Sequence, residues 1–241
     1  MGNLMNEHVK TMDDLSNKVI FLTGASSGIG AAVQQLLLAK GAKVFSMSRS
    51  ATMSKDGNLQ SFKGDVSSES DVKEAFQQCL ETFGTVDVLI NNAGIGLATP
   101  DLAETDLSVF EQMVDTNMRG VFLCSREALK TMKPRGKGHI INLISMAGQR
   151  TNPNAPLYCA SKFGARGLSG GFADQVLKLG IKVTDVNPGP VDSNYWGDRK
   201  VPREKFLKVE DVAKVVLFVL SQPEYMLIRE INFDNMKFLA G

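Results

Sequence analysis

The sequence has almost no excess charge of either sign: 27 lysine and arginine residues face 26 aspartate and glutamate residues, for a formal net charge of +1. A nearly neutral chain has no global field that attracts nucleic acid or an anionic membrane. Long hydrophobic runs are absent too, since the longest, residues 215–220, is far shorter than the roughly 20 residues that cross a bilayer. These absences favour a small-molecule partner, with no nucleic acid and no membrane.

Cysteine and histidine are also scarce. Cys79, Cys124 and Cys159 are widely spaced, which fits neither a disulfide framework nor a zinc cluster and favours packing residues in a reducing compartment. His8 and His139 lie far apart with no metal-ligand spacing around them, so we predict no metal site. The start of the chain lacks the apolar stretch of a signal peptide, and we therefore expect a cytoplasmic protein.

What the sequence does have is a regular alternation of short apolar runs with longer segments of helical period. Strands are predicted at residues 18–23, 43–48, 60–63, 86–91, 139–144, 182–186 and 230–233. Helices are predicted at residues 29–40, 69–83, 108–132, 157–179 and 209–221. Such alternation with right-handed crossovers predicts an α/β fold, a doubly wound parallel sheet of about seven strands in a three-layer sandwich. We expect one domain over residues 17–241, preceded by a flexible segment at residues 1–16.

A glycine-rich turn directly follows the first predicted strand and opens the first predicted helix. It reads Thr23-Gly24-Ala25-Ser26-Ser27-Gly28-Ile29-Gly30, with the spacing G-x-x-x-G-x-G. Glycines permit close backbone approach, and the helix start offers free N–H groups and a positive dipole end to a pyrophosphate. We predict a dinucleotide site here; the alternative is a glycine-rich turn without a ligand. The predicted contacts with the dinucleotide are Gly24, Ser26, Ser27, Gly28, Ile29 and Gly30.

The end of the second predicted strand bears on which dinucleotide binds. Ser48 and Arg49 stand where an NAD-binding protein usually places a carboxylate for the ribose 2′-hydroxyl. A guanidinium can pair with a 2′-phosphate instead. The two residues therefore favour NADP(H), with NAD(H) and a merely solvent-exposed arginine as the alternatives.

Tyr158 and Lys162 are four residues apart in a predicted helix, which brings their side chains onto one face. A free tyrosine has a pKa of about 10, and a neighbouring cation lowers that pKa toward the range of a general acid or base. An ordinary amphipathic helix with an exposed lysine has the same spacing. The pairing suits carbonyl and alcohol chemistry. Because the spacing alone does not distinguish the two interpretations, other motifs in the chain are needed to support a catalytic role.

From about residue 17 to its end, the chain resembles the short-chain dehydrogenase/reductase family. The likeness rests on motifs in the family's order: the turn that ends at Gly30, Asp65-Val66, Asn91-Asn92-Ala93-Gly94, Asn117, Ser145, the Tyr158 and Lys162 pair, and Pro188-Gly189. It implies a Rossmann-like oxidoreductase of the carbonyl reductase type. Two positions depart slightly from the family pattern, because Ile144 stands where many relatives have a second serine and Ser193 where threonine is common.

The resemblance also implies roles for individual residues. Tyr158 would donate the proton and Ser145 would hydrogen-bond the carbonyl oxygen. Lys162 would lower the tyrosine pKa and bind the nicotinamide ribose, and Asn117 would hold a water that links Lys162 to solvent. The implied cofactor contacts are Asp65, Val66, Asn91, Ala93 and Gly94 on the adenosine side, and Pro188, Gly189, Val191 and Ser193 at the nicotinamide end. The run from Asn91 to Gly94 would also steady the central sheet. Without the family, Ser145 and Asn117 read as ordinary polar residues satisfied by backbone.

The family's substrate lid corresponds to the segment between Pro188 and Val209, which is only about twenty residues long here. We therefore expect a short lid and an open pocket. Its candidate lining residues, Met146, Gln149, Tyr195 and Trp196, favour a ketone, a diketone or an aromatic carbonyl. Packing in a subunit contact is an equal alternative for Trp196.

Taken together, these observations predict an NADP(H)-dependent enzyme that interconverts a carbonyl and an alcohol. A non-catalytic NADP(H)-sensing regulator, or an epimerase or dehydratase on the same fold, stays open as an alternative. The helices at 108–132 and 157–179 are long enough to pair with copies of themselves, as in the family, so we expect a homo-dimer or homo-tetramer.

Overall fold

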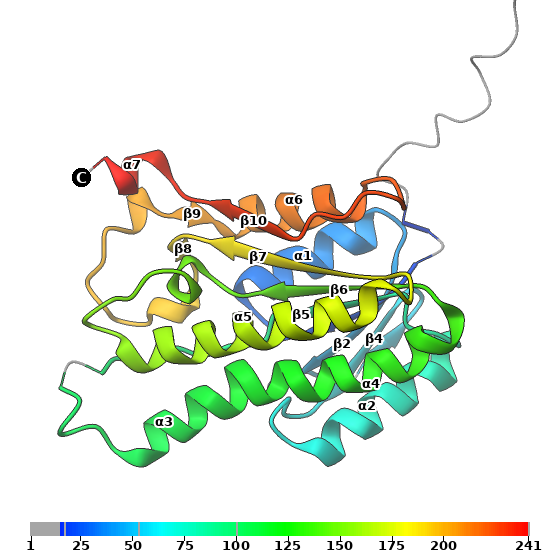
Figure 1. Ribbon diagram of the computed structural model, residues 1–241, viewed down its shortest axis with the longest axis horizontal. Helices are drawn as coiled ribbons and strands as arrows, with labels where there is room; N and C mark the ends of the chain where they lie inside the picture. The colour runs from blue at the N-terminus through cyan, green and yellow to red at the C-terminus, as the bar shows by residue number, and fades with distance from the viewer. Residues whose placement is uncertain (1–14, 17, 53, 100, 241) are drawn as a thin grey trace, which may run out of the picture.

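A twisted parallel sheet runs through the middle of the computed structural model, which describes residues 15–16, 18–52, 54–99 and 101–240 (Figure 1). Its strands are β1 (Val19–Thr23), β2 (Lys43–Ser48), β3 (Ser54–Asp56), β4 (Leu59–Lys63), β5 (Val88–Asn91), β6 (Gly138–Leu143), β7 (Ile181–Pro188) and β10 (Glu230–Phe233). Their spatial order is β10-β7-β6-β5-β1-β2-β4-β3. Seven of these strands are parallel, which confirms the predicted doubly wound sheet.

The eighth strand, β3, pairs antiparallel with β4 at the sheet edge and was not predicted. Its sequence, Ser54-Lys55-Asp56, contains no apolar residue, so hydrophobic patterning gives no signal for it. An edge strand of this kind is held by backbone hydrogen bonds to its neighbour rather than by burial.

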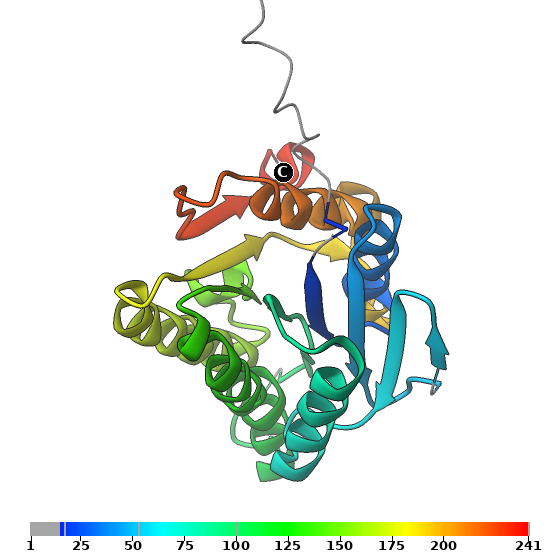
Figure 2. The same ribbon diagram turned by 90° about the vertical axis from the view of Figure 1, so that its right-hand side faces the viewer.

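Helices cover both faces of the sheet, and Figure 2 shows the three layers from one end. One face carries α1 (Gly28–Ala39) and α6 (Val209–Leu220), and the other carries α2 (Glu69–Phe83), α4 (Gly120–Arg135) and α5 (Pro156–Leu177). Because successive strand residues point to opposite faces, Ile20 and Leu22 pack with α1 and α6 while Phe21 packs with α2. Two hydrophobic cores result, one on each side of the sheet.

The helix predicted at 108–132 is continuous but contains a wider turn. It begins as α3 (Leu107–Val114), passes through a π-helical turn at Asp115–Arg119 and continues as α4. A π-turn accommodates one extra residue and so re-aims the side chains within it. Here it buries Asn117, which is only 1% exposed, on the side of the helix that faces the sheet.

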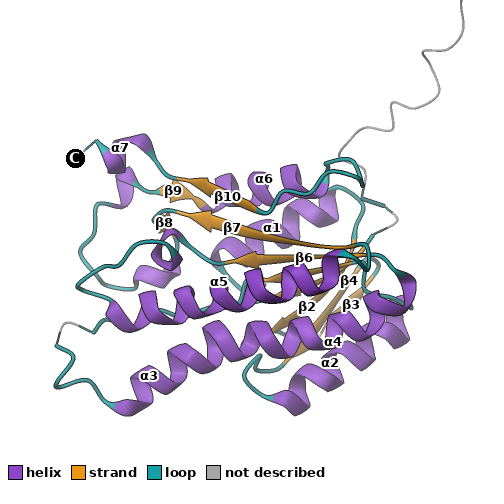
Figure 3. Ribbon diagram, in the orientation of Figure 1, coloured by secondary structure: helices purple, strands orange, loops and turns teal. Residues whose placement is uncertain are grey.

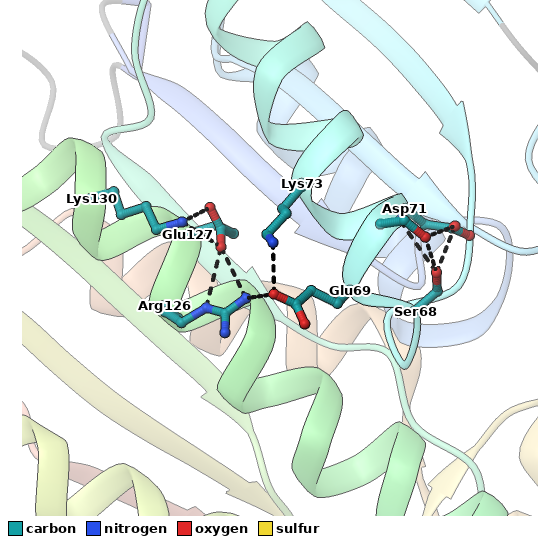
Figure 4. Close-up of polar contacts among 8 residues, drawn as sticks. Ser68, Glu69, Asp71, Lys73, Arg126, Glu127 and Lys130 are labelled. Atoms are coloured by element: carbon teal, nitrogen blue, oxygen red, sulfur yellow. Dashed lines mark hydrogen bonds and ion pairs between the residues drawn. The ribbon is translucent and has the colours of Figure 1, made fainter.

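Ion pairs join α2 to α4 on the outer surface (Figure 4). Arg126 on α4 contacts Glu69 on α2 at 2.8 Å, and Lys73 approaches the same carboxylate at 2.8 Å. Hydrogen bonds from Lys73 and Arg126 lower the pKa of Glu69 to about 2. Exposed pairs of this kind add little stability, so the buried apolar side chains beneath them account for most of the packing of α4.

The C-terminal part of the chain contains the shortest elements (Figure 3). After β7 come β8 (Val191–Asp192), the 3-10 turns η3 (Asn194–Trp196) and η4 (Arg203–Lys205), and β9 (Leu207–Lys208), which pairs with β8. Helix α7 (Met236–Leu239) follows β10. No helix in the described part of the chain combines the length and apolar character needed to cross a membrane.

Most of the segment predicted to be flexible, residues 1–14, lies outside the described residues. Leu15 is described and belongs to the packed domain: it is 3% exposed, and its amide donates to the Lys40 carbonyl at 3.0 Å. The ordered domain therefore includes Leu15, two residues before the predicted boundary at residue 17.

Candidate active site

The glycine-rich turn between β1 and α1 is too tight for side chains. Gly24 and Gly28 have φ angles of 69° and 55°, which L-residues rarely adopt. A Cβ on Gly24 would lie 2.8 Å from Cα of Ala93, and a Cβ on Gly30 would collide with the Gly24 carbonyl. The glycines are therefore required by the turn's own packing as well as by any ligand.

The strand next to β1 in space fastens this turn. Asn92, after β5, donates from Nδ2 to the carbonyls of Thr23 and Gly24 at 2.9 and 3.0 Å. The hydroxyl of Thr23 accepts from the amides of Asn92 and Ala93, both at 3.0 Å. Thr23 and Asn92 both lie in motifs that the sequence analysis identified, but their part in holding the turn follows only from the structure.

The start of α1 fits the pyrophosphate of a dinucleotide. The side chain of its N-cap residue Ser27 makes no capping hydrogen bond, and no acidic residue lies in the first turn. Unpaired N–H groups and a positive dipole end thus face outward beside Gly28. A separate hollow of about 320 Å³ runs from Gly28 along Ala31, Ala32 and Gln35 of α1 to Glu210 at the start of α6, and Asp192, Ser193 and Asn194 also line it.

The residues predicted to select the adenosine end lie at the same edge of the sheet. Ser48 is buried at the end of β2, and Arg49 is exposed beside it. Asp65, after β4, accepts hydrogen bonds at Oδ1 from the amide and hydroxyl of Ser67 at 2.9 and 2.7 Å. Val66 is buried and lies over Gly120 at the start of α4.

The side chain of Asn91 steadies the sheet, which is one of the two roles that the resemblance implies for the run from Asn91 to Gly94. Its side chain is 3% exposed and donates to Ser125 on α4 at 3.1 Å and to Asn142 on β6 at 2.8 Å. The side chain therefore supports the sheet from below and does not face the glycine-rich turn. Ala93 and Gly94 do lie on the open side of that strand end, where Ala93 contacts the turn.

Three of the predicted catalytic residues come together beyond the end of β6. Ser145 follows that strand, and Tyr158 and Lys162 lie one turn apart on α5. The Tyr158 phenol hydrogen-bonds Ser145. Lys162 Nζ lies 5.9 Å from the centre of the Tyr158 ring and donates to the Leu143 carbonyl at 2.9 Å.

The pKa of Tyr158 is shifted in the direction opposite to the prediction. Burial raises the pKa well above the ordinary value for tyrosine, and the nearby Tyr195 raises it further, whereas the hydrogen bond with Ser145 lowers it. Burial also lowers the pKa of Lys162 to about 8. Both shifts have the same physical cause, because a site without water disfavours the charged form of each group.

Asn117 ties the loop after β5 to α5. Its Oδ1 accepts from the Ile95 amide, and its Nδ2 donates to the Ile95 carbonyl, both at 2.8 Å. Nδ2 also donates to Ser161 Oγ at 2.9 Å. A Cβ on Gly94 would lie 3.3 Å from Asn117 Oδ1 and 3.5 Å from Lys162 Nζ, so Gly94 separates these two side chains.

The loop after β7 carries the residues predicted at the nicotinamide end. The Gly189 amide donates to the Phe233 carbonyl at 2.8 Å, which fixes the loop against β10. Ser193 begins the lid and accepts from the Tyr195 amide, and its Cβ lies 3.5 Å from the position of a Cβ on Gly28. The lid and the glycine-rich turn therefore face each other across the cleft.

Known proteins show the same arrangement of sequence and fold. A sequence model of the family described as short chain dehydrogenase matches residues 18–203. The chain belongs to this family. It is 31% identical over 231 residues to an uncharacterized oxidoreductase of Staphylococcus saprophyticus, an alignment that covers 92% of this chain and 98% of that protein. The chain is thus an oxidoreductase of the short chain dehydrogenase family, as the motifs predicted.

Solved structures agree with this short chain dehydrogenase over nearly their whole length. An alcohol dehydrogenase from the archaeon Thermococcus sibiricus, complexed with 5-hydroxy-NADP, has a TM-score of 0.83 and 28% identity over 91% of this chain and 97% of that one. A 3-ketoacyl-(acyl-carrier-protein) reductase from Brucella melitensis, complexed with NADH, has a TM-score of 0.85 and 27% identity over 92% and 99%. These neighbours confirm the Rossmann-like fold.

In this short chain dehydrogenase the lid lies over Tyr158, whereas the sequence predicted an open pocket. The ring centres of Tyr195 and Tyr158 are 5.5 Å apart, and the Tyr195 hydroxyl fills the space beside Gly96. Arg199 lies over the rings of Tyr195 and Trp196 at 4.8 and 5.1 Å. A short lid can still close the site, because a single large aromatic side chain reaches the phenol.

Two of the other predicted pocket residues are used elsewhere. Trp196 donates from Nε1 to the Val191 carbonyl at 2.8 Å and packs on Phe206, so it holds the lid together. Gln149 donates to Asn232 on β10 at 2.7 Å.

Within the part of the chain that the structure describes, no group of three or more His, Cys, Asp or Glu side chains is arranged to hold a metal ion.

Proposed function

We propose that this chain catalyses reversible hydride transfer between NADP(H) and a carbonyl or alcohol substrate. A bound nicotinamide dinucleotide supplies the hydride chemistry, and the protein supplies placement and polarisation. The main support is the meeting of Ser145, Tyr158 and Lys162 at the end of β6, on the same sheet edge as the glycine-rich turn. Ligands of open α/β sheets bind outside this edge.

Tyr158 is the proton donor in reduction. Because burial raises its pKa, the phenol carries its proton at neutral pH and is ready to protonate a developing alkoxide. Ser145 donates its hydroxyl hydrogen to the same substrate oxygen and stabilises the charge that develops there. The contact between the two side chains places both hydroxyls side by side.

Lys162 and Asn117 act behind this pair. Lys162 holds a positive charge beneath the phenol and offers its ammonium group to the ribose hydroxyls of the cofactor. Asn117 fixes the Ile95 backbone against α5 and so keeps the lysine side of the cleft in place. We also propose that Asn117 holds a water that links Lys162 to solvent.

The substrate we propose is a ketone, a diketone or an aromatic carbonyl. The lid presents Tyr195 to Tyr158, and an aromatic surface beside the reacting oxygen favours a flat or apolar substituent. Two of the similar solved structures are an alcohol dehydrogenase and a 3-ketoacyl-(acyl-carrier-protein) reductase, proteins named for alcohol and ketone chemistry.

The decisive test replaces Tyr158 with phenylalanine. We expect Tyr158→Phe to bind NADPH as the wild type does and to lose carbonyl reduction by roughly 10²–10⁴-fold, the contribution of a positioned general acid. NADPH oxidation is followed with a panel of ketones and aldehydes, and Tyr225→Phe, at an 88% exposed tyrosine, serves as the matched control. Turnover retained in Tyr158→Phe would remove this residue from its role. A wild type that binds NADPH but reduces no carbonyl would favour the sensing regulator instead.

The preference for NADP(H) rests on the exposed guanidinium of Arg49 at the end of β2. We expect Arg49→Ala to weaken NADPH binding by about ten- to a hundredfold, the loss of one charge-assisted contact, and to leave NADH binding nearly unchanged. Fluorescence titrations with both nucleotides measure this. Equal losses for the two cofactors would contradict the assignment.

We also propose a homo-dimer or homo-tetramer built on α4 and α5. Large apolar side chains are exposed on and beside these helices: Met118 is 37%, Phe122 45% and Phe163 41% exposed. Apolar groups gathered on helices that a second copy can cover favour self-association. Separately, we propose a cytoplasmic location, because the three widely spaced cysteines fit a reducing compartment.

A further inference from the structure

The backbone of Ser145 has a conformation that residues with a side chain rarely adopt. Its φ is 143° and its ψ 157°, and it is the one non-glycine residue with positive φ among those the structure describes. A residue in such a region persists only where its surroundings hold it there. The candidate catalytic hydroxyl is therefore placed by contacts outside the serine itself.

Contacts within the turn Ser145–Arg150 hold its inner side. The Ser145 hydroxyl accepts from the Ala147 amide at 3.0 Å, and the Ser145 carbonyl accepts from the Gly148 amide at 2.9 Å. Gly148 presses on α5, since a Cβ there would lie 3.1 Å from the Lys162 carbonyl. These contacts join the turn to the helix that carries Tyr158.

The outer side of the turn is held by the C-terminal strand. Gln149 donates from Nε2 to Oδ1 of Asn232 at 2.7 Å. Arg150 pairs with Asp234 at 3.1 Å, where Arg150 is half exposed and the Asp234 side chain is only 9% exposed. The two partners lie 83 and 84 residues later in the chain than the residues they hold.

The C-terminal strand is itself fixed to the sheet. Asn232 lies opposite Asn187 in the β10–β7 register and accepts from its Nδ2 at 2.8 Å. The Asp234 carboxylate occupies the space where Gly189 would otherwise have a Cβ, and the Phe233 carbonyl accepts from the Gly189 amide. This strand end therefore lies between the serine turn and the loop proposed to face the nicotinamide. It also lies outside residues 18–203, the part matched by the family model.

We propose that Asn232 and Asp234 are positioning residues that hold the turn Ser145–Arg150, and thereby the Ser145 hydroxyl, in register with Tyr158. The role rests on the proposed function, because Ser145 is taken as the hydrogen-bond donor to the substrate oxygen. Each residue acts through one partner on the turn, Asn232 through Gln149 and Asp234 through Arg150.

The first test measures the turn without any substrate. In the full chain, Asn232→Ala and Asp234→Asn should each speed hydrogen exchange of the amides at residues 146–150. Gln149→Ala and Arg150→Ala remove the same contacts from the exposed side and give a second route should an Asp234 variant fold poorly. Arg229→Ala is the matched control, because it breaks the exposed pair with Asp174 on the approach to β10 and leaves the turn untouched. Unchanged exchange in all four turn variants would overturn the proposal, whatever the activity of the wild type.

The second test asks whether the effect passes through Ser145. We expect Asn232→Ala and Asp234→Asn to lower kcat by about tenfold, since small displacements of a reacting group are costly, while KM for NADPH stays near wild type. Asn232→Ala also removes the acceptor of the buried Asn187 side chain, so its melting temperature should fall, whereas Gln149→Ala keeps that hydrogen bond and should lower kcat with a melting temperature near wild type. In a Ser145→Ala background the same substitutions should cost nothing further. A tenfold loss that persists without the serine hydroxyl would overturn the positioning role. A wild type that reduces no carbonyl would refute the proposed function and leave the exchange result to decide whether the strand holds the turn.

Discussion

The turn after β1 and the turn after β6 lie at the same edge of the sheet and are built in different ways. The first bends at Gly24 and Gly28, whose positive φ angles cost a glycine little. The second bends at Ser145, whose φ of 143° is unfavourable for a residue with a side chain. A turn that binds a cofactor through its backbone can dispense with side chains, whereas a turn that presents a hydroxyl cannot.

The two turns also differ in what holds them. Thr23 and Asn92 fasten the first turn from strands adjacent to it in the sheet. The second requires the distant strand β10 on one side and α5 on the other. Lys162, directly beneath the second turn, adds a buried charge to the strained backbone. Unfavourable groups thus concentrate at the turn that carries the proposed chemistry, and the remainder of the fold compensates for them.

The largest effect is expected at the first turn. Gly30→Ala should destabilise the protein by about 3 kcal/mol, because the new methyl group collides with the backbone of Gly24 and with Asn92. Gly57→Ala is the comparison: unlike Gly30, Gly57 has a positive φ, but no atom lies within 4 Å of its Cβ position, so backbone strain without collision should cost about 1 kcal/mol. Urea unfolding with and without NADPH measures both. A loss in Gly30→Ala no larger than that in Gly57→Ala would show that the turn relieves the collision at little cost, and would contradict the tight packing of the first turn.

Next in size is the pH dependence conferred by the buried charge at the second turn. Burial lowers the pKa of folded Lys162 to about 8, below its unfolded value of 10.5, so the unfolded chain binds more protons between these values. Stability should therefore rise by about 2 kcal/mol between pH 7 and pH 9.5, and the penalty should be fully present well below pH 8. Lys162→Met should abolish this rise.

Urea unfolding of the cofactor-free protein at pH 7 and pH 9.5 compares the wild type with Lys162→Met. Subtracting the variant removes contributions from other groups that titrate in the same range. Parallel pH profiles for the two proteins would mean that the buried charge of Lys162 does not lower the stability of the fold. The second turn would then, like the first, lie beside no destabilising charge.

The smallest effect isolates the strain at the serine. Ser145→Gly and Ser145→Ala both remove the hydroxyl, and both should lose activity, but only glycine relieves the positive φ. We expect Ser145→Gly to be about 1 kcal/mol more stable than Ser145→Ala. Glycine relieves the backbone strain, and its greater freedom in the unfolded chain offsets part of that gain. Denaturant unfolding measures it. An alanine variant as stable as the glycine variant would show that the serine backbone is unstrained.

The main elements of the fold could be predicted from local pattern. The alternation of apolar runs and helical periods predicted the seven parallel strands, and two of them, Lys43–Ser48 and Glu230–Phe233, agree in both boundaries. Helix Glu69–Phe83 does so as well. The strand β3 and the π-turn around Asn117 escaped prediction, because a polar edge strand has no hydrophobic period, and one wider turn shifts the period of a long helix by a single residue only.

Part of the candidate site could be predicted too. The glycine spacing, and the four-residue separation of Tyr158 and Lys162, are local features that geometry translates directly into a turn and a helix face. The family resemblance added Ser145, which the structure brings to the same phenol. The lid was predicted only in length, and the contact of Tyr195 with Tyr158 depends on how that segment folds back.

The sequence by itself determined the order of strands and helices, the glycine-rich turn and the identity of the groups at the carboxyl edge, because each depends on residues close together in the chain. Only the tertiary structure decided the inward side chain of Asn91, the backbone of Ser145 and its attachment to Asn232 and Asp234. It also reversed the expected direction of the Tyr158 pKa. Burial and contacts between residues more than eighty positions apart are properties of the packed chain, and no local period encodes them.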